Sequence, residues 1–347
     1  MKIEKLDLLK PAIDFLLSEG FSKLYPPQAD CVDAGLLDGK SILVSAPTAS
    51  GKTLTAILAT ISYLSKNNGK VIYLSPLRAL AAEKFTEFKK LEKVELGKKI
   101  KVGISTGDFE NLEKNLEKND VIILTNEKMD SIIRHNAEWI DDIGLVIADE
   151  IHLIGDESRG PTLEMILTKL KLLASKPQIV GLSATITNSD EIANWLDCIL
   201  VKNDWRPVPL SEGVYDAGKV TMSDGKKFEV EPSLCGIPID LGIQSVRDGG
   251  QSLVFAETRT RSKALATKAA EVISQFLEKK ESEELEKISK KILSNNEHTE
   301  LVKTLATLIK KGVAFHHAGL NQNCRQTIET EFRKGTIKLL SSTPTLA

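Results

Sequence analysis

The chain reads Ala46-Pro47-Thr48-Ala49-Ser50-Gly51-Lys52-Thr53 between an apolar run at 41–44 and a segment whose apolar residues have helical spacing. This position predicts a strand-to-helix turn. Backbone N–H groups and the positive end of the helix converge there on one point, which suits phosphate oxygens. Gly51 permits close backbone approach, Lys52 supplies a positive charge, and the Thr53 hydroxyl can ligate magnesium. The stretch therefore predicts a phosphate-binding loop. The expected contacts to the bound group are Ala46, Thr48, Ala49, Ser50, Gly51, Lys52 and Thr53.

A second informative segment, Asp149-Glu150-Ile151-His152, follows the nearly all-apolar run 143–148. Such a run is typical of a central strand that is buried on both faces. Carboxylates at its end would face the phosphate loop, because ligands of open parallel sheets gather at that edge. Asp149 is then placed to hold magnesium through water, and Glu150 to accept a proton from the attacking water. Together the two segments indicate hydrolysis of a nucleoside triphosphate.

Length and composition set limits on the class of protein. A chain of 347 residues predicts two domains, since single cores rarely grow past roughly 250 to 300 residues. Lys plus Arg number 46 against 48 Asp plus Glu, so a polyanion site has to be a local patch. The four scattered cysteines favour reduced thiols and give no zinc-site spacing. No leader sequence or membrane span is recognised, so we expect a cytoplasmic protein without a membrane partner.

Strand-like apolar runs alternate with helical stretches, which predicts an α/β fold with doubly wound, mainly parallel sheets. The expected strands of a first domain, residues 1–200, are 41–45, 70–75, 101–106, 120–125, 145–149 and 178–183. A second domain, residues 201–347, is expected to begin with a linker and a β-hairpin within 201–231. It continues with strands at 251–256, 313–316 and 336–341 and a charged helical region at 263–311, and it looks incomplete.

Further segments complete an ordered series of motifs. They lie at 21–28 (F-S-K-L-Y-P-P-Q), 75–80, 125–128, 183–185, 254–259, 315–320 and 342–347. With the phosphate loop and the D-E-I-H string, this series resembles superfamily 2 helicases of the DExH type. It is most similar to the Ski-like branch and, within it, to the archaeal Hjm/HelQ-type DNA repair helicases. The resemblance covers essentially the whole chain and implies two RecA-like P-loop NTPase domains in tandem, with ATP and Mg²⁺ as cofactors.

The resemblance also implies roles for single residues. Gln28 would read adenine, whose N6 and N7 edge a glutamine amide can pair with. His152 would act with the catalytic residues Lys52, Asp149 and Glu150. The hydroxyls of Ser183 and Thr185 would connect that site to the bound strand. Contacts to the nucleic-acid backbone are implied for Pro76, Arg78, Thr125, Lys128, Arg159, Thr258, Arg259, His317 and Thr343.

Other interpretations of these residues remain open. His316 and His317 could suggest a metal site, but neighbours on a strand point to opposite faces and no further ligand accompanies them. A P-loop GTPase or small-molecule kinase is a weaker alternative, because residues 125–128 only loosely echo the guanine-reading N-K-x-D.

The leading expectation is an ATP-dependent helicase that moves 3′ to 5′ on single-stranded or forked DNA in repair and replication-fork processing. In the helicases that the chain resembles, a further motif, motif VI, follows, and its arginines reach the γ-phosphate. The sequence contains no such segment, so we expect weak or no activity of this chain. The alternatives are a nucleotide- and strand-binding module without turnover, and an RNA helicase of the same branch. No feature of the sequence indicates an oligomeric state.

Overall fold

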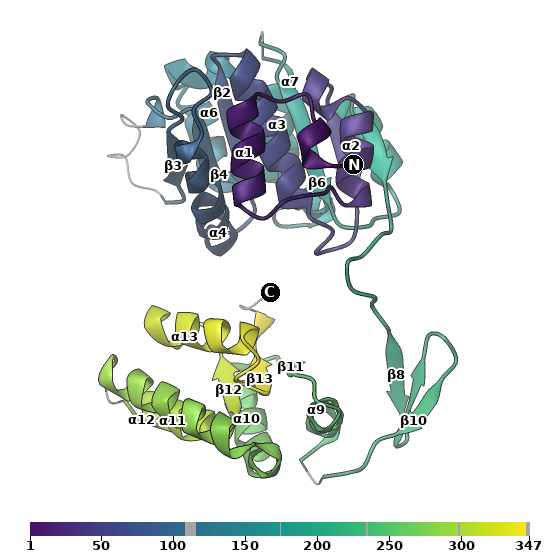
Figure 1. Cartoon of the computed structure of the whole chain (residues 1–347), viewed down its shortest axis with the longest axis vertical. Helices are drawn as coiled ribbons and strands as arrows, with labels where there is room; N and C mark the ends of the chain where they lie inside the picture. Colours follow the sequence, from purple (N-terminus) through teal and green to yellow (C-terminus); the bar gives the residue numbers. More distant parts are fainter. Residues whose placement is uncertain (108–115, 174, 234, 298, 345–347) are drawn as a thin grey trace. The chain divides into compact units, whose positions relative to one another are not determined.

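The computed structural model describes residues 1–107, 116–173, 175–233, 235–297 and 299–344 (Figure 1). The chain divides into two compact units, Met1–Leu210 and Ser211–Ala347. The boundary expected at residue 200 lies earlier than this division. The reason is a short strand, β7 (Ile199–Lys202), which carries the chain past residue 200 by pairing with β1 (Ile42–Ser45).

The first unit is built on a seven-stranded, wholly parallel sheet in the order β3-β4-β2-β5-β6-β1-β7. Its inner strands are apolar and buried on both faces, as parallel sheets covered by crossover helices require. The remaining strands are β2 (Lys70–Ser75), β3 (Val102–Ser105), β4 (Val121–Thr125), β5 (Ile143–Ala148) and β6 (Gln178–Ser183).

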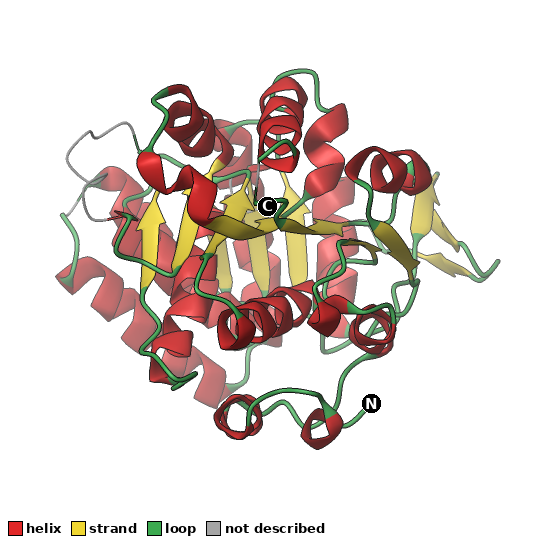
Figure 2. Cartoon of the chain, turned by 90° about the horizontal axis from the view of Figure 1, so that it is seen from above, coloured by secondary structure: helices red, strands yellow, loops and turns green. Residues whose placement is uncertain are grey.

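Helices cover both faces of this sheet, which gives the unit two hydrophobic cores (Figure 2). One core joins the sheet to α1, α2, α3 and α4, and the other joins it to α6, α7 and α8. The helices are α1 (Lys10–Ser18), α2 (Pro26–Asp33), α3 (Lys52–Lys66), α4 (Arg78–Phe88), α6 (Asn126–Arg134), α7 (Gly160–Lys171) and α8 (Ser189–Leu196).

The strand order decides which loops meet. Strands β2, β5, β6 and β1 are consecutive neighbours, so the segments that follow them share one edge of the sheet. The phosphate loop leaves β1, the D-E-I-H string leaves β5, and β6 lies between them. Strands β1 and β5 are therefore two strand spacings apart, about 10 Å. A phosphate group and its metal ion fit within that span.

The second unit begins with a three-stranded antiparallel sheet where the sequence predicts a hairpin. Its strands are β8 (Gly213–Asp216), β9 (Lys219–Met222) and β10 (Lys227–Glu229). The turn at 223–226 was anticipated, and the additional strand β8 pairs with β9 across the turn at Ala217 and Gly218. Both residues of that turn have positive φ, as hairpin turns require.

A parallel sheet in the order β11-β13-β12 forms the rest of the second unit. Its strands are β11 (Ser252–Phe255), β12 (Val313–His316) and β13 (Leu339–Ser342). The charged helical region at 263–311 consists of three helices rather than one. They are α10 (Arg259–Ile273), α11 (Lys279–Ser294) and α12 (Glu300–Ile309), and the unit also contains α9 (Ile237–Arg247) and α13 (Gln322–Arg333).

Among the described helices, none combines the length and the apolar character that crossing a bilayer requires.

Candidate nucleotide site and nucleic-acid contacts

The phosphate loop has the backbone geometry that anion binding needs. Gly51 adopts φ 87°, and α3 begins at the next residue, so the N-terminus of a buried helix opens onto the loop. The Lys52 ammonium donates to the carbonyl oxygens of Ala46, at 2.9 Å, and Pro47, at 3.1 Å. The lysine thus lies folded over the loop. Thr48 and Ala49 are exposed at the tip, and the Ser50 hydroxyl is buried without a hydrogen-bond partner.

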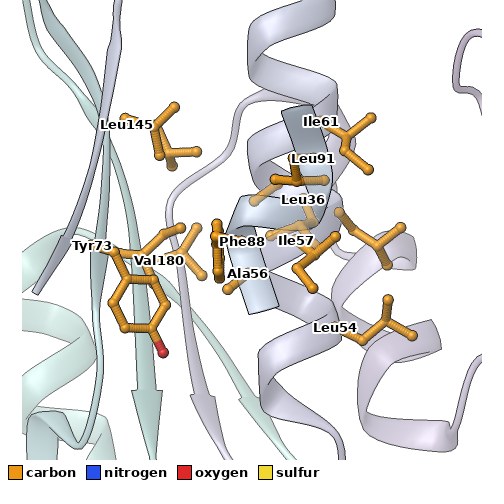
Figure 3. Close-up of a cluster of buried hydrophobic side chains, with 14 of the residues drawn as sticks. Leu36, Leu54, Ala56, Ile57, Ile61, Tyr73, Phe88, Leu91, Leu145 and Val180 are labelled. Carbon is orange, nitrogen blue, oxygen red and sulfur yellow. The ribbon is translucent and has the colours of Figure 1, made fainter. Parts of the chain in front are cut away.

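The carboxylate of Asp149 is fixed by hydrogen bonds to both oxygens. Its Oδ2 accepts from the Tyr73 hydroxyl at 2.6 Å, and its Oδ1 accepts from the Glu150 N–H at 3.0 Å. Tyr73 belongs to β2, the neighbour of β5, and its ring packs in the core against Phe88 with 5.2 Å between centroids (Figure 3). A buried aromatic residue therefore positions the predicted metal-holding carboxylate.

The site perturbs its own ionisable groups. Burial raises the pKa of Glu150, the negative charge of Asp149 adds to this, and His152, Lys52 and Lys84 oppose it. Burial lowers the pKa of Lys52, and the nearby Glu150 and Asp149 oppose that shift. These mutual effects mean that the lysine and both carboxylates lie within electrostatic reach of one another. A raised pKa suits Glu150 for accepting a proton.

Glu150 also has an unusual backbone. Its φ of 49° and ψ of 43° lie in the left-handed region, which costs a non-glycine residue roughly 1 kcal/mol or more. The conformation turns the chain sharply out of β5 into the short helix Ile151–Gly155. Strain at such a position is commonly associated with function.

His152 connects the end of β5 to the end of β6. Its Nδ1 lies 3.4 Å from both Glu150 Oε2 and the Ala184 nitrogen. The nitrogen can accept from the Ala184 N–H only when it carries no proton, and can pair with Glu150 only when it does. The link from His152 to the end of β6 is thus made by the backbone N–H of Ala184. Ser183 Oγ is buried without a hydrogen-bond partner and Thr185 is exposed, so the connection of these hydroxyls to a bound strand stays a prediction.

Gln28 lies at the junction of the phosphate loop and α2. Its Oε1 accepts from the Tyr25 N–H at 2.8 Å, and its Nε2 donates to the Gly51 carbonyl oxygen at 3.0 Å. These partners fix the orientation of the amide and leave it one N–H and one lone pair. A cavity of about 550 Å³ within the first unit is lined by Phe21, Tyr25, Gln28, Gly51, Thr53 and Ile57, among others. The predicted adenine reader and the phosphate loop therefore share one cavity.

The residues fit magnesium and a nucleotide. Thr53 Oγ1 already holds a cation, the Lys84 ammonium at 2.9 Å. A hydroxyl and a carboxylate form an all-oxygen donor set, which Mg²⁺ prefers. A Cβ added to Gly51 would lie 2.1 Å from Gln28 Nε2, so only glycine allows the loop to lie this close to the amide. Thr53 and Asp149 would hold the metal, and Lys52 would bind the outer phosphates.

Three residues near this site were missed by sequence reasoning: Tyr73, Lys84 and Arg206. Arg206 acts on Lys52 electrostatically, and the segment before it is anchored near the loop. The Asn203 N–H donates to the Ser45 carbonyl oxygen at 3.1 Å. These are contacts between distant parts of the chain. The only signal in the sequence was that Tyr73 lies within the apolar run 70–75, which predicts a strand.

The other predicted contacts of the first unit gather at the same sheet edge. Pro76 and Arg78 follow β2, with Arg78 exposed at the start of α4. Thr125 caps α6 by accepting from the Lys128 N–H at 3.4 Å, and the Lys128 side chain is buried rather than exposed. Arg159 precedes α7 and lies 3.9 Å from Asp156.

In the second unit, the predicted contacts gather at the corresponding edge of the second parallel sheet. Thr258 caps α10 by accepting from the Arg261 N–H at 3.2 Å, and Arg259 is exposed. His317 is buried, and its Nδ1 accepts from the Gly319 N–H at 3.1 Å. The Thr343 N–H donates to the His316 carbonyl oxygen at 3.1 Å. Residues 345–347 of the predicted motif lie outside the described residues.

The histidines of this edge have protein partners. His316 Nε2 lies 3.0 Å from Glu329 Oε1 on α13, and His317 stacks on Phe315 with 5.4 Å between centroids. The described residues contain no group of three or more His, Cys, Asp or Glu that could hold a metal ion.

Fold and site together define a P-loop nucleoside triphosphatase with helicase motifs, and comparisons with known proteins specify the class. Residues 25–192 match the DEAD/DEAH box helicase family. The crystal structure of the DUF1998 helicase MrfA bound to DNA superimposes with a TM-score of 0.68 at 20% identity, covering 98% of this chain and 45% of that one. At that identity the match shows the fold alone, and it confirms the predicted α/β architecture of tandem RecA-like domains.

Curated relatives narrow the class further. The chain is 42% identical to the ATP-dependent DNA helicase Hel308 of Methanocella arvoryzae, 43% to that of Pyrococcus horikoshii and 45% to that of Caldivirga maquilingensis. These matches cover all of this chain and 46% to 47% of the relatives, so the chain spans about half their length. Residues 25–192 thus belong to the DEAD/DEAH box helicases, and the similarity of the whole chain to Hel308 confirms the predicted resemblance to superfamily 2 DExH helicases of the Ski-like branch.

Proposed function

We propose that this chain is the ATP-hydrolysing motor of a DNA helicase that moves 3′ to 5′ along single-stranded DNA in repair and replication-fork processing. The observation that carries the proposal is the convergence of Lys52, Thr53, Asp149 and Glu150 at one sheet edge. The similarity to DNA helicases over the full chain supports it. Forked DNA is the expected natural substrate.

Each residue of the nucleotide site has a distinct task. Bound Mg·ATP supplies the scissile phosphoanhydride bond and a cation that offsets the charge on the transferred phosphoryl group. Lys52 leaves the carbonyl oxygens of Ala46 and Pro47 to bind phosphate oxygens. Glu150 accepts the proton of the attacking water at its carboxylate, and His152 links that carboxylate to the end of β6.

The DNA contacts follow from what a motor requires. It has to hold phosphates rather than bases, because it moves along any sequence. Exposed Arg78 and Arg259, which begin α4 and α10, supply cations at helix N-termini. The capping residue Thr258 lies at the start of α10 with Arg259, and Thr125 caps α6 in the first unit. Each unit thus contributes one backbone-binding edge.

The test measures phosphate release from ATP with and without single-stranded DNA of mixed sequence. The expected result is turnover that DNA raises several-fold, with little response to GTP in place of ATP. Release that DNA does not change would contradict the motor. Equal stimulation by single-stranded RNA would identify an RNA helicase of the same branch, and nucleotide binding without release would identify a binding module.

A further inference from the structure

The Lys84 side chain occupies an unexpected place in the nucleotide site. It belongs to α4, only 11% of its side chain is exposed, and its ammonium donates to Thr53 Oγ1 at 2.9 Å. Two carboxylates of the same helix flank it, Glu87 Oε2 at 3.1 Å and Glu83 Oε1 at 3.6 Å. A lysine with two carboxylate partners does not need a neutral hydroxyl to balance its charge. The contact with Thr53 therefore calls for an explanation.

The hydroxyl that Lys84 contacts is the one that the proposed function assigns to magnesium, and this inference rests on that assignment. Mg²⁺ binds an oxygen ligand at about 2.1 Å. With Lys84 Nζ 2.9 Å from the same oxygen, the two cations would lie at most about 5 Å apart. Like charges at that distance in a half-buried site repel strongly. Lys84 and the metal ion thus exclude one another from Thr53.

Lys84 has a second position available without a change in the backbone. Glu87 already accepts a hydrogen bond from its ammonium, Glu83 forms an ion pair with it, and both can retain it when the hydroxyl is released. The lysine can therefore leave Thr53 and remain paired. A rotation of its flexible stem is sufficient, because both carboxylates lie on α4 itself.

We propose that Lys84 competes with Mg²⁺ for the Thr53 hydroxyl, so that binding of the metal–nucleotide complex transfers the lysine to Glu83 and Glu87. Lys84 is a positioning residue in this exchange. It holds the metal ligand in place when no nucleotide is bound, and it sets the magnesium concentration at which the nucleotide binds.

The experiment compares the wild-type protein with Lys84→Met, which keeps the length of the side chain but removes its donors. A fluorescent ATP analogue is titrated at a series of Mg²⁺ concentrations, and again in EDTA. The expected result is a half-saturating Mg²⁺ concentration roughly threefold to tenfold lower in the variant, as follows from loss of a charge-assisted hydrogen bond. In EDTA the affinity should change by less than about twofold. Thermal unfolding provides a second measurement, in which Mg·nucleotide should raise the Tm of the variant more than that of the wild type.

Lys89→Met is the matched control, because Lys89 also pairs with a glutamate three residues on, Glu92 at 2.7 Å, without touching Thr53. It should leave the Mg²⁺ dependence unchanged. Lys84→Gln, which retains a neutral donor, should shift the dependence in the same direction by less, and it replaces Lys84→Met if that variant does not fold.

Two outcomes overturn the exchange. An unchanged Mg²⁺ dependence would mean that Lys84 does not compete for Thr53. Weaker nucleotide binding both with Mg²⁺ and in EDTA would make Lys84 a direct phosphate ligand. Failure of the wild-type protein to bind the analogue at all would instead refute the proposed function, so the two failures can be told apart.

Discussion

The C-terminal edges of the two parallel sheets carry the same kind of strand-to-helix turn but different chemistry. The edge in the first unit combines Lys52 and Lys84 with Asp149 and Glu150, and these charged groups are linked by hydrogen bonds or act on one another electrostatically. The edge in the second unit presents His317 and the capping hydroxyl of Thr258. Burial lowers the pKa of His317, and the positive charge of Arg259 lowers it further.

This contrast shows that a parallel-sheet edge by itself does not specify a reaction. Helices begin at both edges, and helix N-termini favour the binding of phosphate groups. The first edge adds two adjacent carboxylates, Asp149 and Glu150, to which the proposed function gives the metal ion and the proton of the attacking water. We therefore assign the chemistry to the first edge alone and backbone binding to both edges, and the following predictions test that assignment.

The largest effect is expected at Lys52. Replacing it by alanine removes the cation of the phosphate loop, so ATP turnover should fall about a thousandfold. Phosphate release is the measurement, and DNA binding, followed by fluorescence anisotropy, should be retained. Lys66→Ala, at the other end of α3, is the control and should keep wild-type turnover. Turnover within tenfold of wild type in Lys52→Ala would remove the chemical role of the first edge.

Glu150→Gln should lower turnover about a hundredfold while leaving nucleotide affinity nearly unchanged, because the amide cannot accept a proton. The exposed Glu164→Gln on α7 is the matched control. A variant that loses binding as strongly as turnover would argue for a role in holding the nucleotide.

The pH dependence sharpens this assignment. A base has to be deprotonated to accept a proton. Because the pKa of Glu150 is raised from its ordinary 4.5, the wild-type rate of ATP hydrolysis should rise with pH over a range that lies above pH 4.5. The same shift affects stability. A raised pKa favours the folded state below pH 4.5, and this contribution is lost as pH rises through the folded-state pKa. Glu150→Gln should therefore raise the Tm at neutral pH relative to wild type, with no gain below pH 4.5.

A smaller effect is expected at the second edge. Arg259→Ala should weaken binding of single-stranded DNA about threefold to tenfold at low salt and reduce the salt slope by about 0.7, since one phosphate contact is lost. ATP binding should not change. Lys268→Ala, which alters the net charge equally further along α10, is the control. An equal loss in both variants would point to net charge rather than a contact.

The smallest effect is expected for Tyr73→Phe. Losing the hydrogen bond to Asp149 should lower the free energy of unfolding by about 1 kcal/mol and turnover by only a few-fold. Denaturant unfolding and phosphate release measure the two effects. Tyr63→Phe serves as the control for removal of a tyrosine hydroxyl. A loss of turnover as large as that of Glu150→Gln would place Tyr73 in the chemistry itself.

The local patterns of the sequence predicted most of the fold. Each apolar run named for the first sheet forms a strand, because a strand buried on both faces leaves a continuous apolar signal. Strand β7 was missed, since Ile199 and Lys202 at its ends are exposed and the strand lies at the sheet edge. The helical region at 263–311 was not divided, because helical periodicity resumes after each of its short breaks.

The candidate site was only partly predictable. Lys52 and Asp149 belong to strings whose spacing encodes their chemistry. Lys84 and Tyr73 act through contacts made across 31 and 76 residues, and no local pattern encodes such contacts. The connection through Ala184 was also beyond prediction, because a backbone N–H carries no residue identity.

The left-handed backbone of Glu150 has an evolutionary consequence. Glycine would adopt φ 49° without cost, so Glu150→Gly relieves the backbone and removes a carboxylate that burial disfavours. A library selected for heat resistance alone should therefore enrich that replacement and yield variants with a higher Tm that lack the proposed ATP hydrolysis. Retention of glutamate at this turn would then reflect selection for the proposed ATP hydrolysis at the expense of thermal stability.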